Sequence, residues 1–280
     1  MIPAPEHLSW SQVSEYSRCS KSYQLRRLSG APVVPATWLF GGSLVHSAVE
    51  MYNLAHVRGE NIDLDAIWSE ATERTLAEQA ERNPIPFDEW RKPYRGGMDV
   101  DGWIKSGRAH LDAWHSFMLE TDWTIASFEG QPLVEVDLTC EYGWGDEKFV
   151  VKGAADVVME QPRGDLVLLD VKTGSKMPNN FLQLGLYSCS MERLGMPKPP
   201  LGGFFSTKTG ALAAIDSMLQ YTPTYFDDLL TRTRVGISGG VFTPSLVTDI
   251  CRACDVASAC FAVRGHAANL YDPDHPVFLG

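Results

Sequence analysis

The feature that most constrains the fold of this chain is a change of hydrophobic period between residues 131 and 172. QPLVEVDLTCEYG (131–143) and KFVVKGAADVVME (148–160) alternate apolar and polar residues, as half-buried strands do. The turn-like residues between them predict a hairpin. DLVLLDVK (165–172) follows as a third, largely buried strand. Three consecutive strands of this kind predict one sheet at the centre of the molecule.

The segments on either side of these strands have a helical period. Helices are predicted over residues 9–28, 61–82, 99–120, 180–194 and 222–236, and a further helix is predicted to begin with Ser43 as its N-cap. Further strands are predicted at 202–208 and 213–221. This order predicts an α/β fold in which helices flank a mixed central sheet. We expect one domain over residues 1–280, with a helical insertion at 60–125.

Two acids and a lysine lie at the ends of successive predicted strands. Asp156 ends the second strand and Asp170 ends the third, and Lys172 lies two positions further on. Residues i and i+2 of a strand point to the same side, so Asp170 and Lys172 project together while Val171 faces the opposite side. Carboxylates that converge in this way suit Mg²⁺ or Mn²⁺ and the hydrolysis of a phosphodiester. A strand-end salt bridge is the alternative, and by itself the pattern favours that alternative.

The cysteines form a second set. CRACDVASAC carries Cys251, Cys254 and Cys260, and Cys19 is the remaining cysteine outside the apolar patterns that contain Cys140 and Cys189. Six cysteines in a chain expected inside a cell indicate metal binding before disulfides. Three close thiolates with one distant ligand favour an iron–sulfur cluster, although the spacing also fits zinc.

The net charge of −11 argues at first against a nucleic-acid partner. The charge is unevenly distributed, however, because residues 61–90 hold eight acidic and two basic side chains and so account for −6 of it. Residues 1–30 are net positive. Lys21, Arg26, Arg27 and Lys176 are therefore candidates for contacts with a phosphate backbone.

Four separate motifs of the chain, in this order, resemble those of the PD-(D/E)XK nuclease superfamily and its RecB-like branch. They are GGSLVHSAVE with His46, GAAD with Asp156, DVKTG with Asp170 and Lys172, and QLGLY with Gln183 and Tyr187. The resemblance implies a restriction-endonuclease-like fold. It also implies a metal site formed by His46, Asp156, Asp170 and the carbonyl of Val171, with Lys172 assisting the attacking water and Gln183 and Tyr187 positioning DNA.

Each of these motifs also has a structural reading. His46 could be a histidine satisfied within an amphipathic helix, and Gln183 and Tyr187 an ordinary pair at i and i+4. Glu135 in LVEVDL is a further acid that could lie near the metal, and Glu50 could be a solvated charge. The four motifs together outweigh these separate readings.

The cysteine spacing resembles that of the iron–sulfur nucleases of the RecB-like group, namely CRISPR-associated exonucleases of Cas family four and the nuclease domain of AddB helicase-nucleases. This resemblance implies a [4Fe-4S] cluster held by Cys19, Cys251, Cys254 and Cys260. The cluster would join the segments 8–30 and 241–262.

The expected function is therefore metal-dependent DNA exonuclease activity on single strands or ends, in DNA repair, recombination or phage DNA metabolism. The alternatives are an accessory DNA-binding subunit of a helicase-nuclease or CRISPR adaptation complex, and a zinc-stabilised hydrolase of nucleotides or RNA. Partners besides DNA, such as a second copy or recombination or CRISPR proteins, stay open. The sequence has no apolar run long enough to cross a bilayer and no secretory signal, so we expect a cytoplasmic protein without membrane contact.

Overall fold

The computed structural model describes residues 2–92, 97–145, 147–245, 247–252 and 254–264. Positions 246 and 253 of the predicted cluster segment 241–262, and the tail 265–280 of the predicted domain, lie outside the described residues. In the described part, no helix is both long and apolar enough to cross a membrane.

The chain divides into two compact units. The terminal unit comprises Met1–Val34, Thr139–Gly153 and Pro223–Gly280, and the central unit comprises Pro35–Leu138 and Ala154–Thr222. Each unit has a sheet of its own.

The central unit contains the larger sheet, whose strand order is β11-β10-β9-β8-β2, with β5 also paired to β8. Strands β9 and β10 run parallel and the other pairs are antiparallel, so the sheet is mixed, as predicted. Its strands are β2 (Thr124–Ile125), β5 (Val134–Asp137), β8 (Ala154–Glu160), β9 (Leu166–Lys172), β10 (Leu201–Ser206) and β11 (Ala211–Ser217). A separate short hairpin joins β3 (Ser127–Phe128) and β4 (Gln131–Pro132).

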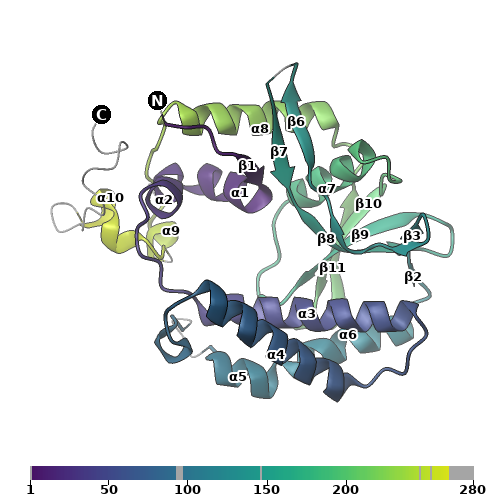
Figure 1. The fold of residues 1–280 in the computed structure, drawn as a ribbon. Helices are drawn as coiled ribbons and strands as arrows, with labels where there is room; N and C mark the ends of the chain where they lie inside the picture. Colours follow the sequence, from purple (N-terminus) through teal and green to yellow (C-terminus); the bar gives the residue numbers. More distant parts are fainter. Residues whose placement is uncertain (1, 93–96, 146, 246, 253, 265–280) are drawn as a thin grey trace. The chain divides into compact units, whose positions relative to one another are not determined.

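Helices cover both faces of this sheet (Figure 1). They are α3 (Thr37–Val57), α4 (Leu64–Arg82), the short η2 (Phe87–Glu89), α5 (Val100–Ser106), α6 (Arg108–Glu120) and α7 (Leu182–Arg193). Val167, Leu169 and Val171 of β9 pack into one core with the apolar side chains of α3 and α6. Because side chains alternate along a strand, Asp170 and Lys172 face the opposite side of the sheet.

The predicted insertion packs into this same core. Trp68, Trp103 and Trp114 from the arm (residues 60–125) are buried there together with Phe40 of α3. The caps of its helices follow from the sequence, because the Asp63 side chain accepts from two amides at the start of α4 and Asp99 accepts from Gly102 at the start of α5.

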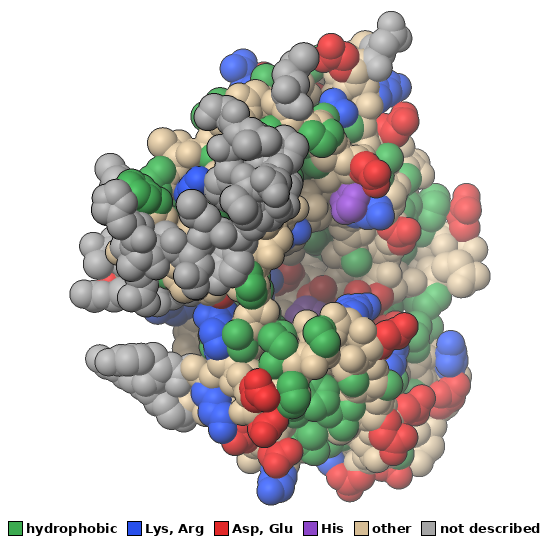
Figure 2. Space-filling view, turned by 60° about the vertical axis from the view of Figure 1, so that its left-hand side comes forward, with side chains coloured by type: hydrophobic (Ala, Val, Ile, Leu, Met, Phe, Trp, Pro, Cys, Tyr) green, Lys and Arg blue, Asp and Glu red, His purple; other side chains and the backbone are tan. Residues whose placement is uncertain are grey.

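The outer surface of the arm is acidic. Figure 2 shows acidic side chains over its helices, in the lower part of the view. Seven acids between residues 61 and 90 are exposed: Asp63, Asp65, Glu70, Glu73, Glu81, Asp88 and Glu89. A surface with this charge repels a phosphate backbone.

The terminal unit holds a three-stranded sheet in the order β1-β7-β6 (Figure 1). Its strands are β1 (His7–Ser9), β6 (Cys140–Trp144) and β7 (Glu147–Lys152). Its helices are α1 (Trp10–Arg18), α2 (Ser20–Tyr23), the π-helix η1 (Gln24–Leu28), α8 (Pro223–Ser238), α9 (Thr248–Arg252), η3 (Ala257–Ala259) and α10 (Phe261–Arg264).

Three sequence expectations are wrong in detail. The long predicted hairpin is broken near Thr139 and Gly153. The halves next to its turn form β6 and β7, and the halves away from the turn form β5 and β8. The helix predicted over 9–28 is interrupted at Cys19, whose backbone is extended with φ −163°. Helix α3 begins at Thr37 rather than after Ser43.

Gly41 lies inside α3, where it allows a close contact with α5. Trp103 of α5 lies directly against Gly41, and a Cβ atom at that position would come within 2.1 Å of the indole. Gly41, which by its sequence reads as part of a loop, is thus a contact surface inside the helix.

Candidate active site

Two of the predicted acids lie where β8 and β9 separate. The antiparallel ladder between these strands extends from Glu160 opposite Leu166 to Val157 opposite Leu169. Asp156 and Asp170 occupy the next step of the same register, where the strands no longer pair. Residues opposite each other on antiparallel strands point to the same side, so both carboxyl groups project from one face of the sheet.

Asp156 is held from two directions. Its Oδ2 atom accepts a hydrogen bond of 2.7 Å from the Val171 amide. This bond takes the place of the backbone hydrogen bond that β8 would supply to Val171 if the ladder continued. The Nδ1 atom of His46, from α3, lies 3.4 Å from the same oxygen. The structure thus brings His46 to the acids, although helix and strand are far apart in sequence.

Glu135 completes a row of three acids across β5, β8 and β9. Strand β5 pairs with β8 at Val134–Val157 and Val136–Ala155, which leaves Glu135 opposite Asp156. Its backbone is left-handed, with φ 45°, an uncommon conformation for a residue other than glycine. One ligand atom from each of Glu135, His46 and Asp156 lies within 4.8 Å of the others.

Lys172 extends beside Asp170. Its Nζ atom is 2.5 Å from Asp170 Oδ2 and 6.0 Å from the centre of the Phe204 ring. Asp170 is 4% exposed, and among the described residues its Oδ2 has no partner with hydrogen-bond geometry.

The shifts in pKa follow from burial and crowding of like charges. Burial, together with the neighbouring Asp156, raises the pKa of Glu135 to about 7 and that of Asp170 to about 6. The charge of Asp156 raises the pKa of His46 to about 9. Burial by itself would raise the pKa of Asp156, but His46, the Val171 amide and Lys172 together lower it.

These side chains fit a hard divalent cation. Ligand atoms of Glu135, His46 and Asp156 converge on one spot, and the nearby carboxyl group of Asp170, like that of Glu135, resists ionisation. A divalent cation at this spot would compensate the crowded negative charge.

Helix α7 carries the last predicted pair. Gln183 Nε2 donates to the Tyr187 hydroxyl over 3.3 Å, so the two side chains do share a helix face. Burial, with smaller effects from Asp170, Asp156 and Glu135, raises the pKa of Tyr187 to about 12, so its hydroxyl stays protonated as a donor. The pair therefore lies within electrostatic reach of the acids.

Glu50, one turn beyond His46 on α3, is not merely a solvated charge. Its carboxylate lies 3.1 Å from the guanidinium of Arg74, which α4 of the arm contributes. Nothing in the sequence indicated this pair, because it depends on how the arm packs.

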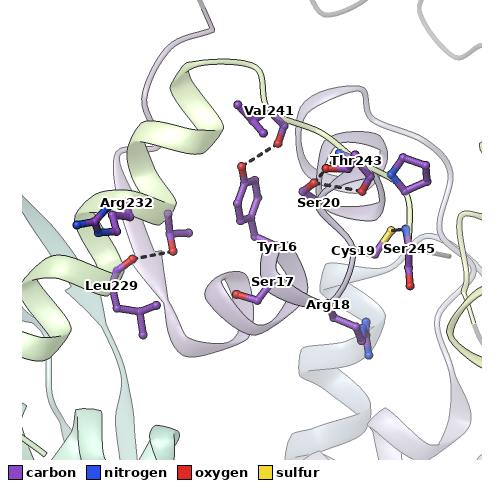
Figure 3. Close-up of a pocket in the computed structure, with 12 residues that line it drawn as sticks. Tyr16, Ser17, Arg18, Cys19, Ser20, Leu229, Arg232, Val241, Thr243 and Ser245 are labelled. Atoms are coloured by element: carbon purple, nitrogen blue, oxygen red, sulfur yellow. Dashed lines mark hydrogen bonds between the residues drawn. The ribbon is translucent and has the colours of Figure 1, made fainter. Parts of the chain in front are cut away.

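The four predicted cluster cysteines lie in the terminal unit. Cys19 Sγ accepts from the Ser245 amide over 3.2 Å, and Cys251 Sγ donates to the Ser245 carbonyl over 3.6 Å. Cys254 and Cys260 pack in a small core with Leu25. Figure 3 shows Cys19 and Ser245 facing each other beside a cavity of about 490 Å³.

The cysteine sulfurs do not form a compact metal-binding group among the described residues. In the described part of the chain, no three of them lie within 4.8 Å of one another. Tetrahedral zinc with Zn–S bonds of about 2.3 Å needs sulfurs about 4 Å apart. Cys140 is half-buried in β6, and Cys189 is buried in α7.

Three candidate basic residues form contacts inside the terminal unit. Glu15, which is 4% exposed, lies 2.6 Å from Arg26 and 2.8 Å from Arg27, and Arg26 also pairs with Asp255. Lys21 donates to Gln24 over 2.6 Å. Lys176 is exposed in the loop that follows β9.

A row of acids with a neighbouring lysine, on a mixed sheet between helices, suits a metal-dependent nuclease. The family model of the PD-(D/E)XK nuclease superfamily matches residues 7–261. The chain therefore belongs to this superfamily, which confirms the resemblance at that level.

Two phage proteins are similar over nearly the whole chain. The Gene 69 protein of Mycobacterium phage D29 is 25% identical over 266 residues, and that of Mycobacterium phage L5 is 26% identical over 281 residues. Each comparison covers 90% of this chain and 95% of the phage protein. A solved structure described as "Crystal structure of SSO0001" matches with 12% identity and a TM-score of 0.38, covering 94% of this chain and 89% of that one.

Proposed function

We propose that this protein is a DNA exonuclease that uses Mg²⁺ or Mn²⁺ and acts on single strands or DNA ends. The row of Glu135, Asp156 and Asp170 on three neighbouring strands, with Lys172 2.5 Å from Asp170, carries the proposal. In this arrangement the carboxylates can bind a metal cation, and the Lys172 ammonium can contact a phosphate.

The residues have separate roles. His46, Asp156, Asp170 and the Val171 carbonyl are the proposed ligands, and Glu135 joins them because of its place in the row. A bound Mg²⁺ or Mn²⁺ supplies an acidified water and stabilises negative charge on the phosphate. Lys172 Nζ orients the attacking water and offsets the charge that develops on the phosphate oxygens. Asp170 holds that ammonium in place.

The proposed substrate is DNA. Gln183 and Tyr187 present an amide and a protonated hydroxyl near the acids, which suits a strand held by its phosphates and sugars. Lys176, exposed after β9, is a candidate phosphate contact. The occurrence of similar proteins in two mycobacteriophages supports a role in phage DNA metabolism.

The experiment is digestion of DNA labelled at the 5′ or 3′ end, single- or double-stranded, with Mg²⁺, Mn²⁺ or EDTA. Covalently closed single-stranded circles of the same sequence are the matched control, because they lack ends. We expect cation-dependent loss of linear DNA and survival of the circles. Equal degradation of the circles contradicts the exonuclease assignment, and degradation in EDTA contradicts the metal assignment.

We further propose that Cys19, Cys251, Cys254 and Cys260 hold a [4Fe-4S] cluster with a structural role. The sulfurs come from both ends of the chain, and one of them accepts an amide hydrogen bond. The cluster would join segments that are separated by more than 200 residues and so close a very long loop.

This proposal is tested by iron, sulfide and zinc analysis of anaerobically purified protein. We expect about four irons per chain and brown colour, with Cys19→Ser protein colourless and Cys189→Ser protein unchanged. Cys189 is the matched control because it is buried in the central unit. One zinc per chain without iron, or a brown Cys19→Ser variant, contradicts the assignment.

A further inference from the structure

Helix α6 of the arm contacts the end of strand β10 through a histidine. His110 Nδ1 lies 2.7 Å from the hydroxyl oxygen of Thr207, the residue that follows β10. The two residues are 97 positions apart in sequence. This contact links the arm directly to the edge of the sheet where the neighbouring strand β9 ends at Lys172.

Thr207 in turn holds the backbone of the proposed catalytic lysine. Its hydroxyl donates to the Lys172 carbonyl over 3.1 Å, and its amide donates to the same oxygen over 3.0 Å. A threonine hydroxyl has one proton, which is used on this carbonyl. With that proton on the carbonyl, the His110 contact is a bond donated by Nδ1–H, which assigns the tautomer of the imidazole.

The imidazole is itself fixed by packing. The ring of Trp103 lies 5.5 Å from that of His110, tilted by 34°, and Trp103 is 7% exposed. The other side of Trp103 meets Gly41 of α3, the helix that carries His46. The arm thus reaches both the metal-ligand helix and the lysine strand from the face of the sheet opposite to the acids.

We propose that His110 is a positioning residue that fixes the Lys172 backbone through Thr207 and so keeps the Lys172 ammonium beside Asp170. This inference rests on the proposed nuclease function, in which Lys172 acts. It gives the acidic arm a part in the reaction that needs no contact with DNA. Loss of His110 frees the Thr207 hydroxyl to rotate, so the strand end that carries Lys172 becomes less well fixed.

A cavity beside this contact makes the proposal testable by chemical rescue. His110 and Thr207 line a space of about 490 Å³ together with Lys208 and Thr209. Removing the imidazole enlarges a space that is already large enough for small molecules. Free imidazole can then occupy the vacated position and donate to the Thr207 hydroxyl.

The experiment compares His110→Ala with His115→Ala in the digestion of single-stranded DNA with Mg²⁺. His115 is the matched control, because it lies on the same helix and its Nδ1 is 3.0 Å from the Tyr52 hydroxyl. We expect His110→Ala to lower kcat about three- to tenfold, the value of one hydrogen bond, with KM unchanged. Added imidazole should restore its activity, while neither wild type nor His115→Ala should respond.

A second readout does not depend on nuclease activity. Hydrogen exchange at the Thr207 amide should be at least about threefold faster in His110→Ala than in wild type and in His115→Ala. If wild type digests no DNA, the proposed function fails, while the exchange rate still tests the contact. Unchanged exchange at Thr207 overturns the inference. An unchanged kcat in an active enzyme, or a lowered kcat without rescue, overturns it equally.

Discussion

Replacing Asp170 by asparagine should stabilise the metal-free protein above neutral pH, although it removes a proposed ligand. The Asp170 carboxyl is 4% exposed, and burial next to Asp156 raises its pKa from the usual 3.8 to about 6. A shift of about two units corresponds to about 3 kcal/mol. Asparagine has nearly the same shape and carries no charge.

The sign follows from proton linkage. The folded protein binds the Asp170 proton more tightly than the unfolded chain, because the folded pKa is the higher one. This contribution to stability is fully present below about pH 4 and is lost as the pH rises through about 6. The Asp170→Asn variant has no proton to lose at this position, so its stability does not fall as the pH rises. Its free energy of unfolding should therefore exceed that of wild type by about 3 kcal/mol near pH 8 and equal it near pH 4.

The assay is urea unfolding in EDTA, followed by the fluorescence of the buried tryptophans, at several pH values. Asp88→Asn is the matched control, because Asp88 is exposed in the same unit. Added Mg²⁺ should stabilise wild type but not Asp170→Asn. A variant less stable than wild type near pH 8 in EDTA would refute the view that the site is built around an unfavourable charge.

Three further changes have defined outcomes. Trp114→Phe should lower the free energy of unfolding by about 1–3 kcal/mol in urea, because the buried Asn53 oxygen loses its 2.8 Å bond from the indole. Glu15→Leu should also lower the free energy of unfolding in urea by about 1–3 kcal/mol, because Arg26 and Arg27 lose their buried partner. The loss is not larger because both arginines are partly solvated. Mn²⁺ binding near pH 6 should release protons, because the pKa values of Glu135 and Asp170 are about 7 and about 6. Calorimetry in buffers of different ionisation enthalpy measures that release, and identical heats would contradict the raised pKa values.

The sequence predicted the parts of the site that depend on local spacing. Asp170 and Lys172 share a side because they are two positions apart on a strand, and Gln183 and Tyr187 share one because they are four apart on a helix. The buried strands β8 and β9 were found because their apolar patterns are strong. These features need no knowledge of distant contacts.

The details that depend on strand register or tertiary packing did not follow from the sequence. Glu135 was expected only as an acid that could lie near the metal, and its place opposite Asp156 depends on the register between β5 and β8 and on its left-handed backbone. Gly41 lies inside α3 against Trp103, which is 62 positions further along the chain. His110 and Thr207 carry no motif, and only the packing of the arm brings them to Lys172.

The most direct test of the account is the Lys172→Ala variant, measured for both DNA digestion and Mn²⁺ binding. Lys172 Nζ is proposed to act on the water and the phosphate, whereas the acids and His46 hold the cation. We therefore expect the rate on end-labelled DNA to fall by about 10²- to 10⁴-fold while Mn²⁺ affinity is retained. Digestion at the wild-type rate by Lys172→Ala would contradict the proposed active site.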